Sequence, residues 1–252
     1  MLIKGPNGSV QAGNVRRMAL LDDVIEASGG MECWNRLKRF TLQLSIDGVL
    51  FSKAGQNGRF KDIVAEGSTQ TQLVRFTGFS SPDSCGVYQP QCVTIEDPEG
   101  RVLRTWSDPQ QSFCDHAKHA VWDELHMVFL CGFSVWNYLT TPFLLARPEI
   151  RVEELPPWPQ HGQLWRRLRA VFPPTVVTHC SEQVFYFDDG GLQRRADHDL
   201  LGTRVAHYSW AHQTFCGILV PTLRRSLTLK PDGTVIAKPS LLDVEIFDAA
   251  FD

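Results

Sequence analysis

Histidine is distributed unevenly along this chain, and its positions are the first guide to chemistry. Five of the eight histidines lie beside a long apolar segment or in the last strand-like segments: His116, His119, His126, His207 and His212. Because an ordinary imidazole has a pKa of about 6.5, it suits proton transfer near neutral pH. These residues are therefore the first candidates for acid/base catalysis.

His126 lies inside the apolar segment, one helical turn after Trp122. A buried imidazole must find a hydrogen-bond partner or face a cavity, so two interpretations stay open. The ring either bonds to a backbone carbonyl within the core or acts as an acid/base or ligand-binding group. Asp123, on the same helical face, could orient this ring or only stabilise the start of the helix.

A metal site on the same helical face is a further alternative. His119, Asp123 and His126 would share one side of the helix if it began before His119, and such a spacing could bind a divalent ion. The apolar pair Ala120 and Val121 and the lack of another carboxylate argue against this alternative. We therefore expect no metal ion.

The last strand-like segments place polar side chains on alternating faces. Along residues 192–201, one face carries Arg194 and His198 and the other carries Arg195 and Asp197. Ionisable groups on the inward face are costly unless they are paired or hydrated. The next segment alternates between two sets, namely His207, Ser209 and Ala211 on one face and Tyr208, Trp210 and His212 on the other. We expect these two segments to contribute groups that hold a ligand.

Arg225 is expected to face inward, because it alternates with the polar positions and shares its face with three leucines, Leu223, Leu227 and Leu229. A buried guanidinium needs an anion. That anion is either a protein carboxylate, Asp197 or Asp199, or an acidic or carbonyl group of a bound molecule that Arg225 would clamp.

Large aromatic side chains follow the apolar segment and could line a cavity: Trp122, Phe129, Phe133, Trp136 and Tyr138. Tyr208 and Trp210 would form its roof. Ligand pockets are typically apolar with a few convergent polar groups, which this arrangement would provide. The alternative is that these aromatics are plain core.

The apolar segment from Trp122 to Leu145 predicts one buried helix. Its apolar residues cover every side of a helical wheel, which is typical of a helix with no solvent-facing side. It is too short and too polar at its ends to span a bilayer, which needs about 20 apolar residues. Pro142 bends or stops it.

Most of the remaining chain predicts short strands separated by turns. Alternation at period two, as in residues 40–47, is typical of half-buried strands. Twelve such segments are expected, at 40–47, 59–66, 71–79, 91–97, 101–107, 151–155, 164–171, 179–188, 192–201, 206–212, 220–229 and 242–248. Two short helices, 19–28 and 31–38, precede them. The predicted fold is α+β and mostly β, a curled antiparallel sheet (an open or half barrel) wrapped around the central apolar helix.

Composition limits the function classes. We expect a flexible tail at residues 1–18 and one domain at 19–252. A formal charge of −3 shows no strong bias, which argues against nucleic acid as a partner. The first residues lack an apolar core typical of a secretory signal, and the seven scattered cysteines suit reduced thiols. We expect a cytoplasmic protein without membrane insertion, and the exposed edges of an open sheet favour pairing with a second copy of the chain.

Three segments carry a resemblance to known proteins. IEASGGMECWNRLKRFTLQLSIDG resembles the opening of proteins with the fold of the bacterial lipoprotein carriers LolA and LolB. WDELHMVFLCGFSVWNYLTTPF and AHYSWAHQTFCGILVPTLRR resemble a family of uncharacterised bacterial proteins of similar length, which we group with the same fold over roughly residues 19–250. An enzyme of the violacein pathway is similar in fold, which implies that such a half barrel can host cofactor-free chemistry on a hydrophobic molecule.

The function expected from these observations is a cofactor-independent enzyme of the lyase, isomerase or cyclase type that acts on a hydrophobic small molecule in a biosynthetic pathway. The usual nucleotide, phosphate-loop, esterase and zinc-protease motifs do not occur, so no cofactor is expected. His126 and Asp123 would supply acid/base catalysis, and His207 or Tyr208 would hydrogen-bond the substrate. The alternatives are a non-catalytic carrier or sensor of an apolar ligand, and a fully packed interior with function on the surface.

Overall fold

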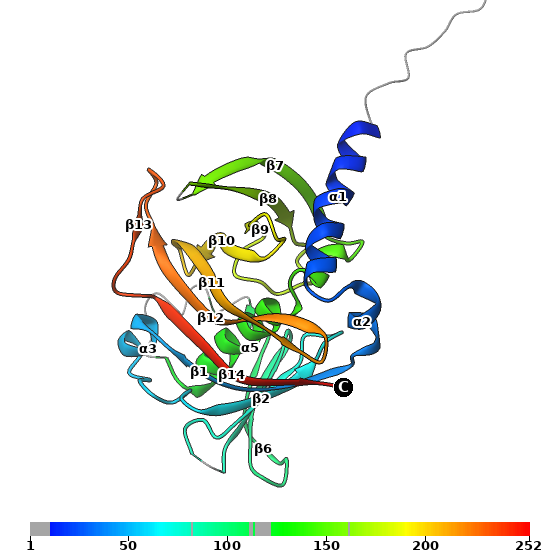
Figure 1. Cartoon of the computed structure of the whole chain (residues 1–252). Helices are drawn as coiled ribbons and strands as arrows, with labels where there is room; N and C mark the ends of the chain where they lie inside the picture. The colour runs from blue at the N-terminus through cyan, green and yellow to red at the C-terminus, as the bar shows by residue number, and fades with distance from the viewer. Residues whose placement is uncertain (1–10, 82, 111–112, 114–121, 161) are drawn as a thin grey trace, which may run out of the picture.

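One antiparallel sheet curls around a single central helix in this computed structural model, which describes residues 11–81, 83–110, 113, 122–160 and 162–252 (Figure 1). The described part of the sheet has 14 strands in the order β6-β5-β4-β3-β2-β1-β14-β12-β11-β10-β9-β8-β7, with β13 paired to β12 outside this path. The two edge strands, β6 and β7, do not pair with each other. The predicted open half barrel is therefore confirmed.

The strands are β1 (Arg39–Asp47), β2 (Ile63–Ser68), β3 (Val74–Thr77), β4 (Cys85–Gln89), β5 (Cys92–Glu96), β6 (Val102–Ser107), β7 (Arg151–Gln160), β8 (Gln163–Val171), β9 (Glu182–Phe187), β10 (Gln193–Leu200), β11 (Thr203–Phe215), β12 (Ile218–Leu229), β13 (Val235–Ile236) and β14 (Leu242–Phe251). The helices are α1 (Gln11–Ala27), α2 (Met31–Arg36), α3 (Val49–Lys53), α5 (Glu124–Thr140) and the 3-10 turn η1 (Phe143–Ala146). Pairing of β1 with β14 joins the first and last strands of the chain into one sheet.

Helix α5 is the centre of the core, as predicted. All of its residues are buried except three, Glu124, His126 and Tyr138. The helix begins after the N-cap Asp123 and ends before Pro142, so it is shorter at both ends than the predicted segment. Pro142 stops the helix because proline cannot donate the backbone hydrogen bond that would continue it.

Two glycines let α5 approach the sheet at β4. A Cβ atom on Gly132 of α5 would overlap Cβ and Cγ of Tyr88, and a Cβ atom on Gly86 of β4 would overlap the side chain of Val128. Tyr88 and Val128 are both fully buried. The backbones of helix and strand therefore meet through these glycines, and no larger residue fits at either position without a shift.

The N-terminal helix is longer than predicted. It begins at Gln11, whereas the sequence predicted a loose tail up to residue 18 and a helix from residue 19; residues 1–10 lie outside the described ranges. The prolines and glycines of the N-terminal segment all precede Gln11, except Gly13. A single glycine inside a helix costs only about 1 kcal/mol, so Gly13 does not prevent the helix. Leu20 and Val24 bury this helix against the core.

We predict that Gly132→Ala destabilises the protein even though alanine favours helices. In a helix, alanine is more favourable than glycine by about 1 kcal/mol, but overpacking of a core costs about 1–3 kcal/mol. The added methyl would meet Cβ and Cγ of Tyr88, which lie next to the backbone of β4 and cannot easily move away. Urea unfolding should show a net loss. Gly190→Ala is the control, because a Cβ there would meet its nearest atom, on Asp188, at 3.4 Å. Unchanged or greater stability of Gly132→Ala would contradict this packing.

Candidate functional site

A cavity of about 620 Å³ lies between α5 and the loops at one end of the curled sheet. Phe129 and Phe133 of α5 form one wall. The loop between β8 and β9 forms another with Phe172 and Val176, and the turn between β10 and β11 adds Leu201. Most of the lining is apolar, so the cavity can hold a hydrophobic molecule.

His179 is one of the polar side chains that line the cavity, together with Gln110, Thr178, Ser181 and Asp199. It lies in the loop before β9 and lines the cavity. Its Nε2 is 3.1 Å from Oγ of Ser134 and 3.1 Å from the hydroxyl of Tyr138, both on α5. The ring of His179 packs edge-on against Phe133, with the ring centroids 5.1 Å apart. The position of this imidazole is thus fixed by the helix.

A buried polar cluster continues behind His179 and is formed by His179, Tyr138, His198, His207 and Ser226. The rings of His179 and His198 are 4.3 Å apart, and Tyr138 stacks on His207 at 4.2 Å. Nδ1 of His207 is 2.8 Å from Oγ of Ser226. Both ring nitrogens of His198 and Nε2 of His207 are buried without a hydrogen-bond partner among the described residues.

Burial keeps these histidines neutral. Desolvation lowers the pKa of His198 to about 3. Desolvation also lowers the pKa values of His179 and His207 well below the ordinary value. The positive charge of Arg224, for His207, and repulsion between the histidines themselves make smaller contributions. Because neutral imidazole both donates and accepts a proton in hydrogen bonds, the cluster can recognise a polar group without carrying charge.

The residue that turns inward on β12 is Arg224, and the prediction for Arg225 was wrong. Arg225 lies on the outer face, where its Nε donates to Asp243 at 2.6 Å. Arg224 is 3% exposed and donates to the backbone carbonyl of Tyr138 at 2.8 Å. The inner face of this strand is polar, with Thr222 and Ser226 on either side of Arg224. Of the three leucines that share the face of Arg225, Leu227 and Leu229 are buried but Leu223 is 41% exposed, so the leucine pattern does not hold at Arg225 itself.

From Arg195 onward the side chains of β10 divide as the alternation predicted, and the inward set contains His198 and Ala196. The prediction that Arg194 shares this face was wrong, because the register shifts between Gln193 and Arg195 and Gln193 lines the inner void instead.

The outward pair Arg195 and Asp197 is buried and satisfied internally. Nη2 of Arg195 donates to Asp197 at 2.8 Å, and the hydroxyl of Tyr186 donates to the same carboxylate at 2.8 Å. Asp197 is thus the partner of its own strand neighbour and not of Arg225.

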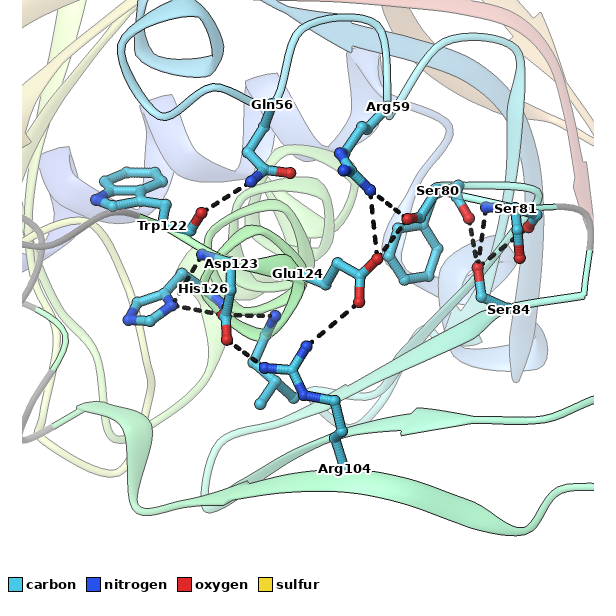
Figure 2. Close-up of polar contacts among 12 residues, drawn as sticks. Gln56, Arg59, Ser80, Ser81, Ser84, Arg104, Trp122, Asp123, Glu124 and His126 are labelled. Atoms are coloured by element: carbon cyan, nitrogen blue, oxygen red, sulfur yellow. Dashed lines mark hydrogen bonds and ion pairs between the residues drawn. The ribbon is translucent and has the colours of Figure 1, made fainter.

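His126 and Asp123 form a helix cap (Figure 2). Oδ1 of Asp123 accepts from the backbone N–H groups of Leu125 at 3.0 Å and His126 at 3.2 Å, and it lies 2.7 Å from Nδ1 of His126. The ring of His126 packs against Trp106. Neither residue lines the cavity among its described residues. This arrangement matches both interpretations of Asp123, because its carboxylate caps the start of the helix and also pairs with the ring of His126.

Charged side chains surround this cap. Glu124 is paired with Arg59 at 3.3 Å and with Arg104 at 3.4 Å, and it also contacts Ser80 (Figure 2). Arg104 additionally pairs with Asp123. Partial burial of Asp123 by itself raises the pKa of its carboxyl, but hydrogen bonds from His126 and Arg104 outweigh burial and hold the pKa below its ordinary value.

The aromatic residues predicted to line the cavity separate into three groups. Phe129 and Phe133 line it, and Tyr138 lies in the polar cluster behind it. Trp122 and Trp136 are core residues, and Nε1 of Trp136 donates to the carbonyl of Ser68 at 2.8 Å. The interpretation as plain core thus fits these two tryptophans.

The predicted roof of Tyr208 and Trp210 was wrong. His207 turns inward on β11, so its neighbours turn to the outer face, where Tyr208 and Trp210 stack on each other at 5.7 Å and Trp210 is 40% exposed. His212 follows a break in the alternation at Ala211, whose φ is 49°. It is half-buried, and its Nε2 donates to the carbonyl of Gln193 at 3.1 Å.

Sequence reasoning missed His179 and Arg224. His179 was predicted at the start of a strand, but β9 begins three residues later at Glu182. Its position in a loop leaves no periodicity that could reveal its direction. The isolated arginine between two small hydroxyl residues, Thr222 and Ser226 on its own face, was the available signal for Arg224.

His116 and His119 lie outside the described residues, so the metal alternative that includes His119 cannot be placed on the structure. Within the described ranges, no group of three or more His, Cys, Asp or Glu residues is arranged to hold a metal ion. In the same part of the chain, no helix has the length and apolar character needed to cross a membrane.

Comparison with known proteins identifies the fold. No family model matches this sequence, and no curated protein matches it. A DUF1329 family protein from Desulfovibrio piger has a similar structure, with a TM-score of 0.51, 13% identity and coverage of 94% of this chain and 93% of that chain. A domain from Vibrio parahaemolyticus named for outer membrane lipoprotein sorting gives a TM-score of 0.51, 9% identity and coverage of 94% and 93%.

A LolA superfamily protein from Nitrosomonas europaea is similar over 92% of both chains, with a TM-score of 0.47 and 7% identity. The first two structures show that this chain has the fold of lipoprotein-sorting domains, and the resemblance in fold noted from the sequence is confirmed. At these identities the likeness concerns the fold alone.

Stability should depend on the protonation of the buried histidines. A histidine in the unfolded chain has a pKa of about 6.5. Below that pH, His198 is therefore protonated in the unfolded chain but stays neutral in the folded protein. Stability is therefore full above the unfolded pKa and falls as the pH drops toward the folded value of about 3. His198→Gln should reduce the slope between these values by up to about 1.4 kcal/mol per pH unit. Urea unfolding at several pH values, with both proteins compared first above pH 7, measures this difference, and parallel curves would contradict it.

Loss of the helix cap should destabilise α5. Asp123→Ala removes the acceptor for two backbone N–H groups, and loss of an N-cap typically costs about 1 kcal/mol. The lowered pKa of Asp123 means that this contribution is present above its unfolded pKa and disappears as the pH falls through the folded value. Thermal unfolding of Asp123→Ala and of a control in the exposed turn, Asp189→Ala, should separate by this amount at neutral pH; equal stability would refute the cap.

Proposed function

We propose that this protein binds a hydrophobic small molecule inside the half barrel, as a carrier or sensor. The observation that supports this proposal is the cavity of about 620 Å³ with Phe129 and Phe133 in its wall. Pockets for small molecules typically have volumes of about 300–1,000 Å³ and are lined mainly by apolar and aromatic side chains. Burial of the ligand's apolar surface would supply most of the binding free energy.

His179 would orient the bound molecule. It is one of the few polar side chains in a mainly apolar lining, and its Nε2 is engaged by Ser134 and Tyr138. Its other ring nitrogen, Nδ1, would hydrogen-bond a polar group of the ligand. A molecule with one polar end and an apolar body would thus suit both walls of the cavity.

A cofactor-independent enzyme of the lyase, isomerase or cyclase type is the second candidate. The observation that favours it is the hydrogen-bonded pair of His179 and Tyr138 beside the cavity. In this proposal His179 replaces His126 and Asp123 as the acid/base group, because those two residues form the helix cap. Positioned acid/base groups typically contribute about 10²–10⁴-fold in rate.

Binding can be tested with the fluorescent apolar probe N-phenyl-1-naphthylamine. We expect the wild-type protein to bind it and Cys180→Trp to weaken binding at least about tenfold, because Cys180 lines the cavity and the indole would occupy part of its volume. Cys92→Trp is the matched control, since Cys92 is also half-buried but lies on β5. Absence of binding by the wild type, or equal loss in both variants, would refute the proposal.

Mass spectrometry separates the carrier from the enzyme. A bacterial metabolite extract is incubated with the wild-type protein and with His179→Gln, and protein-bound and free molecules are identified. The carrier predicts a bound species of unchanged mass and composition with both proteins. Conversion of a hydrophobic metabolite by the wild type, lost in His179→Gln but retained in His126→Gln, would favour the enzyme instead.

A further inference from the structure

Arg224 is a buried cation that forms no ion pair within the described part of the chain. It is 3% exposed, and its hydrogen bonds go to neutral groups, the carbonyl of Tyr138 at 2.8 Å and Oγ of Ser209 at 3.2 Å. Its Nε has no partner among the described residues. The neighbouring Arg225, which lies on the surface, has an acid partner in Asp243. Because an unpaired charge is costlier when it is buried than when it is exposed, an anion would stabilise Arg224 more than Arg225.

A stack of rings connects Arg224 to the cavity wall. Its guanidinium lies over the ring of Tyr138, 5.1 Å from the centroid. The same ring stacks on His179, which borders the cavity, with centroids 5.4 Å apart. Burial lowers the pKa of Arg224 only to about 10, so the positive charge is present at neutral pH. The rings of Tyr138 and His179 are neutral, so they place no opposing charge between Arg224 and the cavity wall.

A small void lies behind His179, and polar side chains line it. Its volume is about 10 Å³, roughly the space for one water molecule. Its lining includes His198 and His207 with their unpartnered nitrogens, together with Gln193 and Asn137. No aspartate or glutamate is among its described lining residues. The void therefore offers several donors and no carboxylate among its described residues, whereas the described lining of the main cavity contains one carboxylate, Asp199, whose side chain is exposed.

We propose that the ligand is a hydrophobic anion, such as a long-chain carboxylate, whose charged end lies at the inner wall beside His179 and in the field of Arg224. This inference rests on the proposed function and specifies its ligand class. The apolar chain would lie along Phe129 and Phe133. A cationic end would be repelled by Arg224, and a neutral hydroxyl would satisfy the donors without meeting the charge.

The test is competition against N-phenyl-1-naphthylamine by three ligands with the same chain: dodecanoate, dodecanol and dodecyltrimethylammonium. At about pH 8 the carboxylate is ionised, and all three are used below their micelle concentrations. We expect dodecanoate to bind the wild type at least about tenfold more tightly than dodecanol, and the ammonium compound to bind most weakly. This comparison needs no variant, so it stands even if a substitution prevents folding.

Two variants locate the charge. Arg224→Gln should remove the preference for dodecanoate over dodecanol, whereas Arg225→Gln, the matched control on the outer face, should keep it. Loss of the preference in Arg225→Gln would place the anion instead in the outer groove beside Trp210 and Leu223 and would overturn the inference. Equal affinity of the wild type for dodecanoate and dodecanol would also overturn it while leaving hydrophobic binding intact. Failure of every probe to bind would instead refute the proposed function.

Discussion

The structure depends on one constraint: helix α5 is apolar on every side and must be covered on every side. A flat sheet covers one face of a helix, so the sheet curls around α5 (Figure 1). The closest contact is at β4, where Gly132 of the helix and Gly86 of the strand bring the two backbones together. This contact fixes how far α5 lies from the rest of the sheet.

Helix α5 packs tightly against β4 on one side, and its other sides face polar groups and a cavity. Toward β10, β11 and β12 the helix meets the buried polar cluster and, beside it, Arg224, and toward the loop between β8 and β9 it borders the cavity. Tyr138 and Phe133, on the same helix, contribute to the cluster and to the cavity wall respectively. One helix thus positions both the apolar wall and the polar end of the candidate site.

The sequence was informative where the physical signal is periodic. The apolar segment predicted α5, and alternation predicted most strands, because burial of one side leaves a regular pattern. Strand β4 was missed, since Gly86 replaces the expected apolar residue where the helix approaches. Arg225 was predicted to face inward because it shares its face with leucines. The inner face of β12 is instead the polar one that carries Arg224. His179 lies in a loop, and only the folded chain brings it to Tyr138.

The central claim is that the space between α5 and the loops of the sheet holds an apolar ligand with its polar end at His179. A crystal structure of the protein with ω-bromododecanoate tests it most directly, because the anomalous signal of bromine locates the chain. The account predicts bromine in the cavity, among the phenylalanines, and the carboxylate next to His179. Bromine density confined to the outer face near Trp210, or an unoccupied cavity at saturating ligand, would contradict it.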